Sequence, residues 1–142
     1  MHKRQSEELE SRLKELFLSK ILHSYSAMAD EARKETASYE EFLLGVLRQE
    51  CESRRQKRIA RYLKESRLPL EKTLESFEMR RLPVSVLHQV KALLDGEFLD
   101  RHENLLVFGS PGSGKTHLVS GIGQELIKKG KRIYSTSCAI LL

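Results

Sequence analysis

The chain has no tryptophan, and phenylalanine and tyrosine together make up only 6% of its 142 residues. Proteins that hold single-stranded nucleic acid by base stacking need aromatic side chains, so this class is disfavoured. The two cysteines, Cys51 and Cys138, are isolated and lack CxxC or Cys/His spacing, which predicts free thiols rather than a zinc site. No apolar run reaches the roughly 18 residues that a membrane helix needs, and no apolar run follows the basic N-terminal residues, so we expect a cytoplasmic protein without a membrane partner.

Positive charge is concentrated in one segment of the chain. The whole chain carries +5, and residues 48–67 hold eight basic side chains against three glutamates, which is also a net +5. Five of these basic residues are separated by helical spacings and are the candidate DNA contacts: Arg54, Lys57, Arg58, Arg61 and Lys64. Such a stripe can neutralise phosphates without reading bases, which predicts non-specific DNA binding, while the alternative is an ordinary solvated helix face.

The first half of the chain has two amphipathic patterns. Apolar residues recur at helical spacing from Leu9 to about Ala32, which predicts one helix. A second helix is expected to begin after Ser38, because Ser38 and Glu41 have the spacing of a capping box, and to run to about Arg67. Two such helices should pack as a hairpin, since each has an apolar stripe to bury.

The stretch from Leu68 to Pro83 contains two prolines and mixed polar residues, which is typical of an ordered connector. We expect Leu74 and Phe77 to anchor it on an apolar surface. Helical spacing returns at residues 84–94 and stops at Asp95 and Gly96. The predicted organisation is a helical N-terminal domain over residues 1–68, a connector over 69–83 and a second domain over 84–142.

A short apolar run, residues 105–108, is typical of a buried parallel strand, and GSPGSGKT follows it directly and fits GxxxxGK[ST]. Such a loop wraps a polyphosphate with backbone N–H groups, so glycine is needed for close approach. Lys115 would reach the β- and γ-phosphates of ATP, and Thr116 would offer its hydroxyl to Mg²⁺. The predicted nucleotide-binding residues are Gly109, Ser110, Pro111, Gly112, Ser113, Gly114, Lys115 and Thr116; the alternative is a glycine-rich turn without a ligand.

After this loop a helical pattern (Leu118, Ile122, Leu126, Ile127) ends at Gly130, and residues 132–135 read as a second strand. The region has the size of one βαβ unit, so the predicted fold class is α/β, with an incomplete P-loop NTPase domain and a partial parallel sheet. Hydrolysis also needs an acidic residue on another strand. The only acidic residue after Lys115 is Glu125, so we expect no complete catalytic site and no ATP hydrolysis by this chain alone.

Several stretches occur in the order found in one family: SYEEFLLGVLRQE, RRQKRIARYLKESRLP, KTLESFE, FLDRHENLLVFGSPGSGKTHL and KGKRIYSTSCAILL. The chain resembles the IstB-like ATP-binding helpers of bacterial insertion sequences, which are similar to DnaC helicase loaders and carry an AAA+ ATPase core. The resemblance implies ATP and Mg²⁺ as ligands, DNA and the transposase of the same element as partners, and a homo-oligomer of the full-length protein. It also implies that the chain is an N-terminal fragment or a prematurely ended reading frame. Two alternatives stay open, namely a helicase loader and a non-enzymatic helical remnant that binds DNA or a partner.

Overall fold

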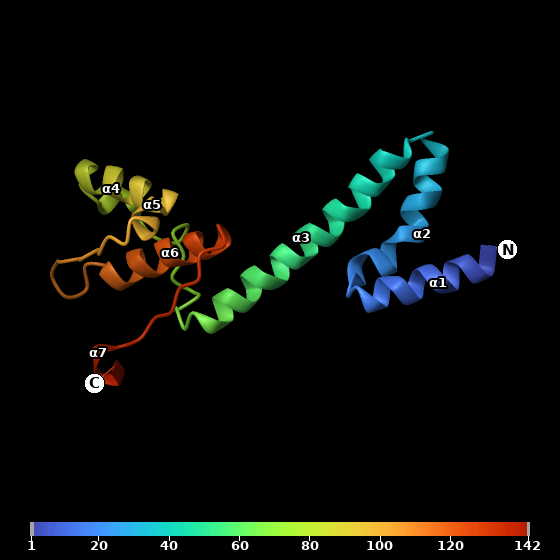
Figure 1. Ribbon diagram of the computed structural model, residues 1–142. Helices are drawn as coiled ribbons and strands as arrows, with labels where there is room; N and C mark the ends of the chain where they lie inside the picture. Colours follow the sequence, from blue (N-terminus) through green and yellow to red (C-terminus); the bar gives the residue numbers. More distant parts are fainter. Residues whose placement is uncertain (1, 142) are drawn as a thin grey trace. The chain divides into compact units, whose positions relative to one another are not determined.

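The computed structural model describes residues 2–141, and its regular structure over this range is helical (Figure 1). The chain divides into two compact units, one ending at Lys57 and the other beginning at Arg58. The helix α3 (Tyr39–Glu65) continues through this division. No helix of the described range combines the length and apolar character needed to cross a bilayer.

The first unit contains α1 (His2–Glu15), α2 (Ser19–Lys34) and most of α3. Each helix contributes one buried apolar side chain to a shared core, namely Leu13, Ile21 and Val46. Partly buried side chains surround these three: Leu18, Leu22, Tyr25, Met28 and Phe42. Part of each amphipathic stripe therefore faces a common core, as the spacing predicts, whereas Leu9, Leu16 and Phe17 of the first pattern are exposed.

The predicted single helix from Leu9 to about Ala32 is wrong, because the chain turns between α1 and α2. Phe17 adopts a left-handed conformation with φ +56°, and its side chain is 83% exposed. The Phe17 N–H donates to Lys14 O at 3.0 Å and the Leu18 N–H to Leu13 O at 2.9 Å. These two bonds form a Schellman motif, which normally has glycine at the left-handed position. The helical spacing continues across the break, so apolar periodicity alone did not reveal it.

The start of α2 is capped by a side chain from α3 rather than by its own N-cap residue. Glu50 Oε2 accepts the backbone N–H groups of Lys20 at 2.9 Å and Ile21 at 3.2 Å. Its other oxygen accepts Arg54 Nε at 2.8 Å, and Arg54 Nη2 also donates to Phe17 O at 2.9 Å. Burial acts to raise the pKa of Glu50, but the hydrogen bonds from Arg54, Ile21 and Lys20 outweigh it and leave the pKa below its ordinary value. One carboxylate therefore joins the two helices.

The predicted capping box at the start of α3 is confirmed. The Ser38 N–H donates to Glu41 Oε2 at 2.8 Å, and the Glu41 N–H donates to Ser38 Oγ at 3.2 Å. Hydrogen bonding of the Glu41 carboxylate to the Ser38 backbone N–H, and secondarily to the Ser38 side chain, lowers the pKa of Glu41. At its other end α3 stops at Glu65, close to the expected limit, and Arg67 is left-handed with φ +56°.

The second unit continues with an irregular connector, the 3₁₀ turn η1 (Met79–Arg81), α4 (Val84–Asp95), α5 (Glu97–Asp100), α6 (Lys115–Lys128) and α7 (Cys138–Leu141). Its core is formed by Val90 of α4 together with Leu118, Ile122 and Leu126 of α6. Leu74 and Phe77 pack against this core, which confirms that they anchor the connector. The helices α4 and α6 end just before glycines, as predicted. Gly96 (φ +80°) and Gly130 (φ +91°) both adopt the left-handed conformation that is typical of helix C-termini.

The predicted parallel sheet, and with it the α/β fold class, is wrong: residues 2–141 contain no strand. Residues 105–108 and 132–135 do not pair with each other, and the second segment instead donates one bond, from the Ser135 N–H to Ser66 O at 2.7 Å. The side chains of Leu106 and Phe108 are 75% and 85% exposed. A sheet requires neighbouring backbones that exchange hydrogen bonds, and an apolar run signals a tendency to burial without supplying that neighbour.

Candidate nucleotide-binding site

Residues 109–114 form a turn that leads directly into α6. Gly112 and Gly114 have φ values of +76° and +88°, which L side chains rarely adopt. A Cβ atom at Gly112 would meet nothing within 4 Å, so the backbone there is open to a ligand. A Cβ atom at Gly114 would lie 2.9 Å from Phe77 Cε2. The two glycines thus serve different needs, one giving access and the other close packing against the connector.

Lys115 is held by its own loop. Its ammonium donates to the carbonyl oxygens of Gly109 and Ser110, both at 2.7 Å, and lies 3.4 Å from Ser113 Oγ. A lysine ammonium has three donors, so these contacts engage all of them. The longest contact, to Ser113, is the one that a phosphate oxygen would most readily replace.

The first turn of α6 provides further donors. Gly114 is the N-cap residue and makes no side-chain cap hydrogen bond. The backbone N–H groups of the first turn therefore lack an intrahelical acceptor, and the positive end of the helix dipole lies at the same place. The Thr116 side chain is exposed at this end. Open glycine backbone, uncapped N–H groups and a lysine form a donor set that fits a phosphate group.

A cavity of about 250 Å³ lies at this end of α6, and the residues that line it are Lys72, Gly112, Gly114, Lys115, Thr116 and His117. Four of the eight predicted nucleotide-binding residues are therefore brought together around it. Gly109, Ser110 and Ser113 contribute by holding the Lys115 ammonium. Pro111 lies in the same turn without a contact that explains a role.

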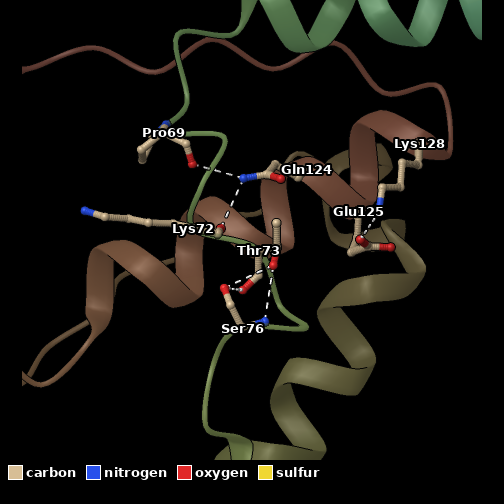
Figure 2. Close-up of polar contacts among 7 residues, drawn as sticks. All are labelled: Pro69, Lys72, Thr73, Ser76, Gln124, Glu125 and Lys128. Atoms are coloured by element: carbon tan, nitrogen blue, oxygen red, sulfur yellow. Dashed lines mark hydrogen bonds and ion pairs between the residues drawn. The ribbon is translucent and has the colours of Figure 1, made fainter.

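The connector runs along one face of α6 and fixes the start of the helix. Gln124 Nε2 donates to Pro69 O and Lys72 O, both at 3.1 Å (Figure 2). His117 Nε2 lies 2.9 Å from Thr73 O, so this nitrogen carries a proton, and the His117 ring meets the Phe77 ring edge-on at 5.2 Å between centroids.

Sequence reasoning missed His117, Gln124 and Lys72. A signal was present, because positions 114, 117, 121 and 124 of this helix share one face and carry only glycine or polar side chains. A face of that kind allows a backbone to approach closely. Indeed, a Cβ atom at Gly121 would lie 2.9 Å from the Leu74 backbone nitrogen.

Glu125, the acidic residue of α6, does not line this cavity. Glu125 lies more than two turns along the helix and accepts a hydrogen bond from Lys128 Nζ at 2.6 Å (Figure 2). Among residues 2–141, no three His, Cys, Asp or Glu side chains gather in a way that could hold a metal ion. The chemistry that this arrangement supports is the binding of phosphate.

Comparison with known proteins agrees with this geometry. A family profile described as IstB-like ATP binding protein matches residues 11–142. The chain belongs to this family. One relative is the protein of insertion sequence IS5376 from Geobacillus stearothermophilus, named as ATP-binding, which is 38% identical over 119 residues, covering 84% of this chain and 47% of the relative. Another is the protein of insertion sequence IS21 from Pseudomonas aeruginosa, also named as ATP-binding and 35% identical over 126 residues, covering 89% of this chain and 48% of the relative.

A third relative, an insertion-sequence protein of Sinorhizobium fredii that is also named as ATP-binding, is 38% identical over 125 residues, with 87% of this chain and 42% of the relative covered. The chain spans about half the length of the curated relatives it matches. The family profile covers the turn at residues 109–114 and all of α6, since it matches residues 11–142.

The five candidate DNA contacts of this IstB-like chain all lie on α3, and their surroundings differ. Arg54 is engaged by Glu50 and by Phe17 O, although its side chain is still 55% exposed. Arg61 Nε lies 3.9 Å from Glu65 Oε1. Lys57, Arg58 and Lys64 form no ion pair with an acidic side chain within the described part of the chain. These three are the ones whose charge is available to a polyanion.

Proposed function

We propose that this chain binds ATP through residues 109–116 and forms part of a DNA-binding helper of insertion-sequence transposition. The observation that carries the nucleotide part is the meeting, at one point, of left-handed glycines, an uncapped helix start and Lys115. Family membership supports the same ligand, because IstB-like relatives are named as ATP-binding.

In this proposal each group of the loop has a separate task. The uncapped N–H groups of α6 donate to the phosphate oxygens, and Lys115 exchanges its long contact to Ser113 for a phosphate oxygen while keeping the two carbonyl contacts that orient it. The Thr116 hydroxyl is the ligand that this chain would offer to Mg²⁺, a hard cation that prefers oxygen and would neutralise part of the phosphate charge. The proposed role of this segment is nucleotide binding, and it does not include the activation of water for ATP hydrolysis.

Titration of the purified chain with a fluorescent ATP analogue in the presence of Mg²⁺ tests the nucleotide proposal. Lys115→Ala should lower the affinity by about tenfold or more, since one charge-assisted phosphate contact is worth roughly 1.5–3 kcal/mol. Lys91→Ala is the matched control, because Lys91 is an exposed lysine of α4 outside the cavity. Equal affinities of the two variants would refute the assignment of the loop.

We also propose that the helical N-terminal domain, residues 1–68, binds DNA through α3 without reading sequence. The support is the absence of acidic partners for Lys57, Arg58 and Lys64 in the described structure, together with the net +5 of residues 48–67. Cations that are not already paired can displace the counterions of a phosphate backbone, whereas Arg54 would first have to leave Glu50.

The salt dependence of DNA binding tests this second part. Reversing two charges with Arg58→Glu and Lys64→Glu should reduce the slope of log affinity against log salt by about 1.8, at about 0.9 for each lost phosphate contact with duplex DNA. The control is the pair Lys20→Glu and Lys91→Glu, which changes the net charge equally at exposed positions outside the stripe. If both double variants keep the wild-type slope, α3 is not the DNA contact.

The partner that we propose is the transposase of the same element, because the relatives belong to insertion sequences. Co-purification of this chain with a transposase of the same insertion sequence measures this directly. Retention in the presence of ATP and DNA supports the proposal, and failure of the two proteins to associate under those conditions opposes it.

A further inference from the structure

Lys72 of the connector has its backbone fixed beside α6. The Lys72 N–H donates to Pro69 O at 3.1 Å, and the Lys72 carbonyl accepts Gln124 Nε2 at 3.1 Å. The next residue, Thr73, is held in turn by His117 at 2.9 Å. Two of these hydrogen bonds join the connector to residues of α6 that are more than forty positions away in the sequence, so the base of the Lys72 side chain has a defined place beside α6.

Lys72 lines the same cavity of about 250 Å³ as Gly112, Lys115 and Thr116. Its ammonium points away from Gln124 (Figure 2), and it forms no ion pair with an acidic side chain in the described part of the chain. The residue as a whole is half-buried. Because the Lys72 backbone is fixed and its ammonium group forms no ion pair with the described residues, the positive charge of Lys72 is unpaired and stays close to this cavity.

The two lysines of the cavity differ in what their ammonium groups do. Lys115 spends its donors on Gly109, Ser110 and Ser113, so it organises the loop as well as facing a ligand. Lys72 has no such internal acceptor among residues 2–141. No acidic residue lines the cavity, whereas two lysines do. A cavity with this charge, at an uncapped helix start, favours a ligand with several negative charges.

We propose that Lys72 is a second phosphate-contacting lysine of the nucleotide site, supplied by the connector and acting on the polyphosphate chain together with Lys115. This inference rests on the proposed ATP binding by residues 109–116. It explains why the connector is tied so closely to α6: the contacts of Gln124 and His117 place a distant lysine at the phosphates. The positive charge comes from outside the GxxxxGK[ST] pattern, so the pattern alone does not identify it.

Competition of a fluorescent ATP analogue with ATP and with inorganic tripolyphosphate tests the inference on the full chain, with Mg²⁺ present. Lys72→Gln should weaken binding of both competitors by about fivefold to tenfold, as expected for one partly exposed charge-assisted contact. Lys72→Arg keeps the charge and should stay within about twofold of the wild type. Lys91→Gln is the control for the loss of one surface lysine and should leave both affinities unchanged.

The outcomes separate this inference from the proposed function. If Lys115→Ala abolishes binding while Lys72→Gln behaves like Lys91→Gln, the nucleotide site stands and Lys72 has no part in it. Equal losses for Lys72→Gln and Lys72→Arg would mean that the residue acts through structure rather than charge, which also overturns the inference. A loss of DNA affinity without a loss for ATP or tripolyphosphate would assign the phosphate contact to DNA instead. If the wild-type chain binds neither competitor, the proposed function fails and the inference with it.

Discussion

Replacing Glu50 by alanine should destabilise the first unit by about 3 kcal/mol. The Glu50 side chain is only 6% exposed and accepts three hydrogen bonds, from the Lys20 and Ile21 N–H groups and from Arg54. Loss of a helix cap costs about 1 kcal/mol, and the two freed N–H groups raise this to roughly 2 kcal/mol. The ion pair adds about 1 kcal/mol rather than the larger figure for fully buried pairs, because Arg54 is half exposed.

Urea unfolding followed by circular dichroism measures this difference. Glu52→Ala is the matched control, since Glu52 is an exposed neighbour on the same helix and its oxygen lies 3.9 Å from Arg55. That change should stay within about 0.5 kcal/mol. Glu50→Gln keeps an acceptor oxygen for the two N–H groups and loses the charge, so it should fall between the two. If Glu50→Ala and Glu52→Ala unfold at the same urea concentration, Glu50 does not join α2 to α3 as described.

The same carboxylate makes a signed pH prediction. Its pKa is lowered in the folded chain, so its contribution is complete above the ordinary value of 4.5 and is lost as the pH falls through the lower folded value. Acidification below about pH 4.5 should therefore reduce the stability of the wild-type chain more than that of Glu50→Gln. Parallel pH profiles for the two proteins would contradict this linkage.

Three further changes test local features. Gly121→Ala places a Cβ atom 2.8 Å from Leu74 Cδ2 and 2.9 Å from its backbone nitrogen, so thermal unfolding should show a loss of about 1–3 kcal/mol; an unchanged melting temperature would mean that the connector moves aside. Ser38→Ala removes the acceptor of the Glu41 N–H and should lower the free energy of unfolding in urea by about 1 kcal/mol. A variant as stable as the wild type would refute this. Phe17→Gly should leave stability unchanged or raise it by up to about 1 kcal/mol, because φ +56° suits glycine and the side chain is exposed; marked destabilisation would show that the ring packs on something.

Local sequence signals predicted the structure correctly where a few neighbouring residues determine it. The pair Ser38 and Glu41 forms its box, and Gly96 and Gly130 mark helix ends, because capping depends on atoms within one turn. The turn at Phe17 could not be read in this way, since neither glycine nor proline stands there and the apolar spacing continues across it. That turn is determined by the packing of Leu13 and Ile21 on α3 and by the cap from Glu50.

The turn that leads into α6 could be anticipated because the glycines of one short pattern determine its backbone, while its binding of phosphate stays a prediction. The contacts that support the loop could not, because Gln124 and His117 bond to carbonyl groups of residues 69–73 and any sequence can supply a carbonyl. The sheet was predicted from the apolar character of residues 105–108, and that character says nothing about whether another backbone lies beside it.

The extended residues 105–108 have a consequence for how the chain behaves in solution. Their backbone N–H groups take no part in a helix or in another backbone hydrogen bond of the described structure, so their deuterium exchange should be fast while that of buried Ile127 is slow. The segment is also uncharged, apolar and free of proline, which is the composition of stretches that associate between chains at high concentration. We therefore expect self-association of the chain to increase with protein concentration.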